Sequence, residues 1–210
     1  MRTLVLALAA ALAIAGCGSS SPHPTSSATT TTAAAKPGPE GIPLEQGAAL
    51  APPTTTAPSG TIDAIQCAPL EQLAYHIHAH LQFYVNGQPR ALPAGIGLIV
   101  PVGQQTPAGA FYGATLCYWW LHTHASDGII HIESPTAHIY TLGNFFDEWR
   151  QPLGASQAGP VKGSITAFVN GARISGNPRD IPLKAHEVIQ VDVGVPVVPF
   201  QNVSFAGSQL

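Results

Sequence analysis

Alternating apolar and polar residues dominate residues 61–200 and predict a β-rich fold. In the run HIHAHLQFYV, residues 76–85, the apolar residues share one face of a strand and the histidines share the other. Asn86-Gly87, which follows, is a typical hairpin turn. The run ITAFVNGARI, which begins at Ile165, again places Val-Asn-Gly at the end of a strand, and EVIQVDVGVPVV, residues 187–198, predicts a further strand.

One segment has a helical pattern instead. In YTLGNFFDEWRQPL, Thr141 is a suitable N-cap, and the two phenylalanines and Trp149 fall on one side at helical spacing. Gly143 weakens this helix, and Pro152 ends it. We therefore expect one short helix among the strands.

The order of these elements predicts the fold class. CYWWLHTHASDGIIHIESP has the pattern strand, turn, strand, with Asp127-Gly128 in the turn. From Tyr118 onward the order is strand, strand, helix, strand, strand, which predicts an α+β, β-rich single domain with a mixed, β-grasp-like sheet and one packed helix. Residues 76–85 would add an N-terminal hairpin. An all-β sandwich is the alternative if the helical segment forms only a turn.

The N-terminal residues have the composition of an export signal and a tether. Arg2 precedes an apolar run that is too short to span a bilayer and ends in small residues, which predicts a signal peptide over residues 1–16. Residues 14–17, Ile-Ala-Gly-Cys, resemble a bacterial lipoprotein box, so Cys17 would be the first mature residue and carry the lipid; an ordinary cleaved signal is the alternative. Residues 17–60 are rich in Ser, Thr, Pro and Ala, which predicts a disordered tether. The domain would cover residues 61–200, and residues 201–210 would form a tail.

The cysteines and the charge limit the choice of compartment and partner. After export, Cys67 and Cys117 remain, and two cysteines in an oxidising compartment most simply form a disulfide. The rival interpretation makes Cys117 a metal ligand. The formal net charge is -3 and only 9% of residues are charged, with no basic patch, so we expect no nucleic-acid partner.

Histidines are concentrated in one part of the domain and predict a metal site. In a strand, two histidines in the order His-x-His point to the same face, and imidazole is the commonest metal ligand. If the loop that contains Asp127-Gly128 has four residues, His122 lies opposite His131. If that loop has only two residues, His124 lies opposite His131. Both registers place Glu133 on the same face, whereas a three-residue loop would break the prediction. The predicted ligands are His78, His80, His122, His124 and His131.

Glu133 has three possible roles: ligand, partner that orients a histidine, or general base. His76 starts its strand and would lie too far out, and Asp127 would shape the turn. Neutral imidazoles with a carboxylate suit Zn²⁺, Cu²⁺ or Fe²⁺. The only methionine, Met1, would leave with the signal, so a Met-rich copper(I) site is excluded. The alternative is that the histidines lie on a solvent-exposed strand face and bind metals only loosely.

These motifs resemble those of a known family. LHTHASDGIIHIE followed by TLGNFFDEW is similar to the motif pair LHTHxxxGIIHxE and TLGxFFxxW in secreted or lipid-anchored prokaryotic proteins, and the resemblance covers roughly residues 67 to 200. It implies export and the same histidine cluster, but no particular activity or metal. The family motif continues Trp-Gly where this chain has Trp149-Arg150, which affects only the helix end.

Three functions fit these observations. The first is an exported, lipid-anchored protein of the cell envelope that holds or delivers a transition metal. The second is a metal-dependent hydrolase or hydratase with Glu133 as general base. The third is a metal-free interaction module of the envelope. The sequence contains no GxSxG motif, which would indicate a serine hydrolase.

Overall fold

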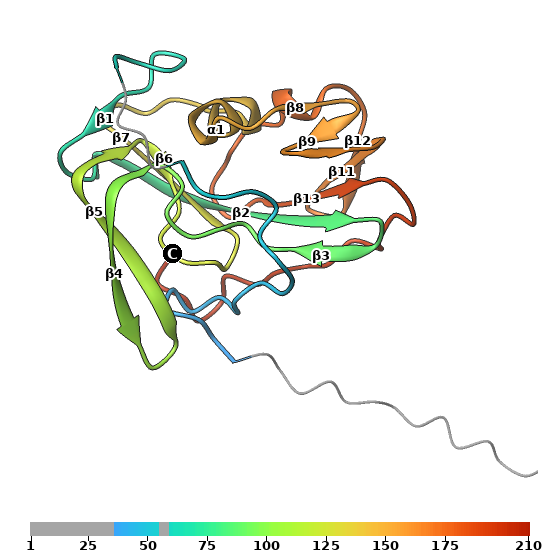
Figure 1. The fold of residues 1–210 in the computed structure, drawn as a ribbon, viewed down its shortest axis with the longest axis horizontal. Coiled ribbons are helices and arrows are strands. Elements are labelled where there is room, and N and C mark those ends of the chain that lie inside the picture. Colours follow the sequence, from blue (N-terminus) through green and yellow to red (C-terminus); the bar gives the residue numbers. More distant parts are fainter. Residues whose placement is uncertain (1–35, 55–58) are drawn as a thin grey trace, which may run out of the picture. The chain divides into compact units, whose positions relative to one another are not determined.

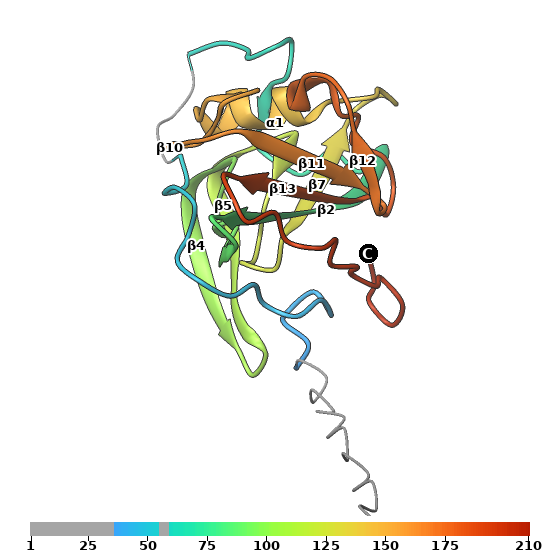
Figure 2. The same ribbon diagram turned by 90° about the vertical axis from the view of Figure 1, so that its right-hand side faces the viewer.

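The structure, a computed structural model, describes residues 36–54 and 59–210. Its main sheet is mixed, because β2 (Tyr75–Val85) pairs in parallel with β13 (Val188–Val193) and antiparallel with β7 (Ile129–Ser134). The strand order is β12 (Ala172–Ile174), β11 (Ile165–Val169), β13, β2, β7 and β6 (Leu121–His122), and β3 (Gln88–Arg90) also pairs with β2. β2 lies in the middle of this order, and Figures 1 and 2 show it beside β13. The prediction of a β-rich domain with a mixed sheet and one helix is therefore confirmed. The sheet differs from a β-grasp-like order, because β2 was expected as an addition and lies in the centre.

The predicted helix covers one face of this sheet. α1 (Leu142–Trp149) begins at the N-cap Thr141, whose hydroxyl accepts a hydrogen bond from the N–H of Asn144. Its apolar side is fully buried, and Phe146 packs edge-on against Phe83 of β2, with ring centroids 6.0 Å apart. The short 3₁₀ helix η1 (Pro178–Asp180) lies beside it. The histidines of β2 therefore lie on the opposite face.

Two hairpins of the sheet share one turn chemistry. Asn86 and Gly87 between β2 and β3 have φ angles of 49° and 76°, and Asn170 and Gly171 between β11 and β12 have φ angles of 50° and 84°. Positive φ at both central residues defines the turn that matches the twist of antiparallel strands, and Asn-Gly suits it best. Both predicted Val-Asn-Gly turns are thus confirmed.

A long hairpin beside the sheet was not predicted. β4 (Leu98–Thr106) and β5 (Gly109–Trp119) form a two-stranded ribbon, seen in green in Figure 1, and β1 (Cys67–Ala68) pairs with β5. A disulfide joins Cys67 to Cys117 across this pair, which confirms the predicted pairing and excludes Cys117 as a metal ligand. Three short strands form a separate small sheet: β8 (Leu153–Gly154), β9 (Gln157–Ala158) and β10 (Val161–Lys162).

The folded unit begins earlier than predicted. Residues 36–54, assigned to the tether, pack on the domain with Ile42, Leu50 and Ala51 buried, and Pro52 accepts a hydrogen bond from the indole of Trp149. A few apolar residues suffice to fix this segment, because they insert into an existing core. The predicted tail is also partly fixed, because the N–H of Gln201 donates to the side chain of Gln190.

The remaining N-terminal predictions lie outside the described residues. These are the signal peptide, the lipid on Cys17 and the first part of the tether. Within residues 36–54 and 59–210, no helix has both the length and the apolar character needed to cross a membrane.

Candidate metal centre

The register of three strands brings the predicted histidines together. β7 lies between β2 and β6, and it pairs His131 with His78 on one side and with His122 on the other. The pairing of His122 with His131 corresponds to the four-residue loop considered above. Glu133 lies opposite His76 on β2. Directly opposite residues share a face of the sheet, so these side chains converge on the face away from α1.

The centre is closed to solvent on most sides. His78, His122, His124, His131 and Glu133 are all buried. The ribbon covers His124, because the ring of Phe111 stacks on it at a centroid distance of 4.6 Å. Buried polar groups need partners, so the contacts of each ring determine what the centre can bind.

Backbone carbonyls fix the orientation of two rings. Nδ1 of His122 lies 2.8 Å from the carbonyl oxygen of Trp119, and Nδ1 of His124 lies 2.6 Å from that of Tyr112. A carbonyl oxygen only accepts, so each Nδ1 must carry the proton and donate it. The neutral rings then present unprotonated Nε2 atoms, which lie 3.1 Å apart. This tautomer is typical of metal-binding histidines.

His131 lies between two carboxylates. Its Nε2 is 2.6 Å from Oε1 of Glu40, and its Nδ1 is 3.3 Å from Oε1 of Glu133. Glu40 belongs to the N-terminal segment and was not predicted as part of the site. Oε2 of Glu133 lies 3.9 Å from Nε2 of His122 and has no hydrogen-bond partner, although it is buried. The centre thus contains a carboxylate oxygen without a donor.

The protonation states follow from burial and from these carboxylates. Burial and the neighbouring rings lower the pKa of His124 to about 4, and they lower the pKa of His122 well below its usual value. Burial also lowers the pKa of His131, but hydrogen bonds to Glu133 and Glu40 outweigh it and raise that pKa to about 9. In the metal-free protein, one positive charge therefore resides on His131, between the two carboxylates.

A second group of donors lies on β2. Nε2 of His76 is 2.9 Å from Nε2 of His78 and 3.1 Å from Oε1 of Glu133, while Nε2 of His78 is 3.2 Å from Nδ1 of His131. The side chain of His76 is 36% exposed. The expectation that His76 would lie too far out is wrong, because its ring turns toward Glu133.

The distances among these donors suit coordination by a metal ion. In one group, His122, His124, His131 and Glu133 each offer a ligand atom within 4.8 Å of the others, and His76, His78 and His131 form a second group. Four ligands at 2.0–2.1 Å around a tetrahedral zinc ion lie about 3.3–3.4 Å apart. Neighbouring donors within these groups lie 2.9–3.3 Å apart, close to that value, whereas Oε2 of Glu133 lies 3.9 Å from Nε2 of His122.

The other histidines of the described residues lie outside these groups. His80 is buried on β2, the strand of His76 and His78. Its ligand atoms do not belong to either group, and its Nδ1 has no hydrogen-bond partner. His138 is exposed beside Tyr140, and His186 is exposed beside Phe205. The prediction that His80 is a ligand thus has no support from the geometry.

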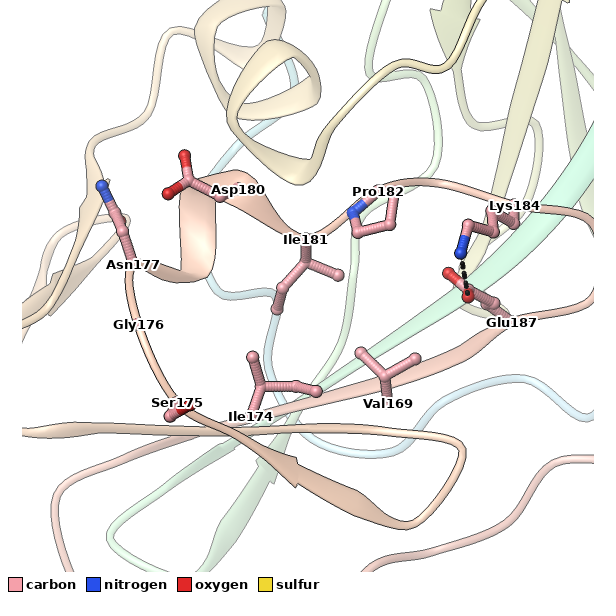
Figure 3. A pocket seen from close by; sticks show the side chains of 10 residues that line it. All are labelled: Val169, Ile174, Ser175, Gly176, Asn177, Asp180, Ile181, Pro182, Lys184 and Glu187. Atoms are coloured by element: carbon pink, nitrogen blue, oxygen red, sulfur yellow. Dashed lines mark ion pairs between the residues drawn. The ribbon is translucent and has the colours of Figure 1, made fainter.

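The space next to the centre is small. The cavity that touches His122 and Glu133 also involves Glu71, Trp119 and Trp120, and it is too small to admit a water molecule. A more open pocket has an apolar wall that includes Ile174 and Ile181 and a polar edge with Lys184 and Glu187 (Figure 3). None of the clustered histidines lines that pocket.

Comparisons with known proteins add no relative. No protein-family model, no curated protein and no solved structure matches the chain. The family resemblance described above therefore stays a prediction.

Proposed function

We propose that this chain is an exported, lipid-anchored protein that holds or delivers a transition metal ion through His122, His124, His131 and Glu133. The support is a buried group of imidazoles and one carboxylate, drawn from β6, the loop after it and β7. Buried polar groups are costly without partners, and a cation satisfies all four at once.

One arrangement carries this proposal: the Nε2 atoms of His122 and His124 face each other, and the tautomers that the backbone carbonyls select leave neither Nε2 with a proton. Each ring already uses its single proton on a backbone carbonyl, so two lone pairs point at one another across 3.1 Å. A metal ion between them turns this repulsion into two bonds. Neutral imidazoles with a carboxylate suit Zn²⁺, Cu²⁺ or Fe²⁺, and the donors leave the choice among these open.

The surroundings favour holding a metal over acting on a substrate. A catalytic site needs space for a substrate beside the metal, whereas the cavity at His122 and Glu133 is too small for water. The proposed compartment is supported by the disulfide between Cys67 and Cys117, which is consistent with an oxidising location.

Metal analysis of the full chain, purified without an affinity tag and dialysed after exposure to Zn²⁺, tests the proposal. We expect at least one tightly bound ion per chain. The variant His122→Ala/His124→Ala should bind at least one ion fewer, and the control His138→Ala, which changes an exposed histidine outside the cluster, should match the wild type.

The folding of each variant should be checked by near-ultraviolet circular dichroism. A wild-type chain that retains no ion, or a folded double variant that retains as many ions as the wild type, would overturn the proposal.

A further inference from the structure

We propose that the cluster formed by the two groups of donors described above holds two divalent transition-metal ions and that the carboxylate of Glu133 bridges them. The first ion binds at His122 and His124. His131, which belongs to both groups of donors, then binds the second ion together with His76 and His78. This inference rests on the proposed function and deepens it, because it assigns a second site and a bridging ligand.

The second site has three imidazole nitrogens that lie close together, and Oε1 of Glu133 contacts two of them and closes a ring of contacts. His76 Nε2, His78 Nε2, His131 Nδ1 and Glu133 Oε1 are separated in turn by 2.9, 3.2, 3.3 and 3.1 Å. Each of these distances between donor atoms is close to the value expected for ligands of one tetrahedral ion, which is about 3.3–3.4 Å. Strand register produces this ring, because His78 lies opposite His131 and His76 lies opposite Glu133.

Glu133 presents one oxygen to each site. Its Oε1 belongs to the ring just described, whereas its Oε2 lies 3.9 Å from Nε2 of His122 and has no hydrogen-bond partner. The side chain is only 2% exposed, so bulk solvent does not reach this second oxygen. A carboxylate in this position binds one cation through each oxygen.

Glu71 lies at the edge of the first site. Its Oε1 lies 3.5 Å from Nε2 of His124, and its side chain is 36% exposed. Glu71 therefore adds negative charge beside one of the two histidines of the first site, whose own donors are His122, His124 and Glu133. Glu71 precedes β2 in the chain, so the sequence pattern of the strands gave no indication of this contact.

Glu40 orients one histidine of the second site, His131. Its Oε1 accepts a hydrogen bond from Nε2 of His131, which leaves Nδ1 to face His78 and Glu133. Carboxylates that bind the outer nitrogen of a ligand histidine are a common feature of metal sites. Together with Glu71 and Glu133, Glu40 also supplies negative charge to offset two adjacent dications.

A single ion does not account for all the donors. Ligands around one ion at bond lengths near 2.1 Å lie at most about 4.2 Å apart. The histidines of β2 and the pair His122 and His124 fall into two separate groups, even when separations up to 4.8 Å are allowed. Two ions, with Glu133 between them, use every donor.

Copper(II) is a suitable probe, because two bridged ions, about 3.5–4 Å apart, alter each other's electron paramagnetic resonance spectrum. The full chain, exposed to Cu²⁺ and dialysed, should retain two ions per chain and show a spin-coupled spectrum. His76→Ala/His78→Ala should retain one ion with an ordinary uncoupled spectrum, and His138→Ala should resemble the wild type. His76→Ala alone, which changes a partly exposed residue, serves if the double variant does not fold.

The outcomes separate this inference from the proposed function. One ion in the wild type, unaffected by His76→Ala/His78→Ala, overturns the second site and leaves the proposed function intact. Two ions without spin coupling overturn the bridge. No bound ion overturns both proposals.

Discussion

Single residues outside the strand pattern determine the chemistry of the histidine cluster. The carbonyls of Trp119 and Tyr112 select the tautomers of His122 and His124, and Glu40 does the same for His131. The alternation of residues along the strands, with a period of two, predicted that His122, His131 and Glu133 share one face of the sheet. It did not predict Glu40 or Glu71, because both reach the cluster from segments without a regular pattern.

Burial of an unpaired carboxyl gives a residue-scale prediction at Glu148 of α1. Neither of its oxygens makes a hydrogen bond of ordinary geometry, and burial raises its pKa well above 4.5, with the N–H of Leu121 offsetting only part of the rise. The folded state therefore binds the proton more tightly than the unfolded state. Its contribution to stability is complete below about pH 4.5 and decreases as the pH rises toward the folded-state pKa.

We expect Glu148→Gln to raise the free energy of unfolding at pH 8 by about 1–3 kcal/mol, because the amide carries no charge to bury. The gain should be much smaller at pH 4.5, where Glu148 of the folded protein is protonated. Urea denaturation at the two pH values measures the difference. An equal gain at both pH values, or a loss at pH 8, would contradict a raised pKa of this carboxyl in the folded state.

At the scale of elements, regular alternation and capping residues were sufficient to predict most of the main sheet and α1. β2, β7, β11 and β13 each have a buried apolar face, and Thr141 caps the helix as expected. The β4–β5 ribbon was missed because many of its residues are at least partly exposed on both faces, and so show no alternation. The central position of β2 depends on long-range pairing with β13, which a local pattern does not encode.

The end of α1 gives a prediction at this scale. Arg150 follows the helix with φ 58° and ψ 35°, a left-handed conformation that glycine adopts without steric cost. Arg150→Gly should therefore raise the free energy of unfolding by about 1 kcal/mol. Arg150→Ala removes the same side chain but keeps the strained backbone, so it should give no gain. Equal stability of both variants in urea denaturation would contradict this explanation.

At the scale of the whole folded unit, residues from distant parts of the chain depend on one another. Composition assigned residues 36–54 to the tether, yet Ile42 and Leu50 are buried in the domain and Glu40 reaches His131. Average composition hides such a segment, because a few apolar residues fix it to a surface that the rest of the chain provides. The cluster therefore combines contacts from this segment, the ribbon and the sheet.

Anomalous X-ray diffraction from crystals of the full chain with bound Zn²⁺, measured on both sides of the zinc absorption edge, tests the central claim most directly. The account predicts a zinc peak within about 2.0–2.1 Å of Nε2 of both His122 and His124. A map without a peak in the cluster, or with zinc only at exposed residues such as His138 and His186, would contradict it.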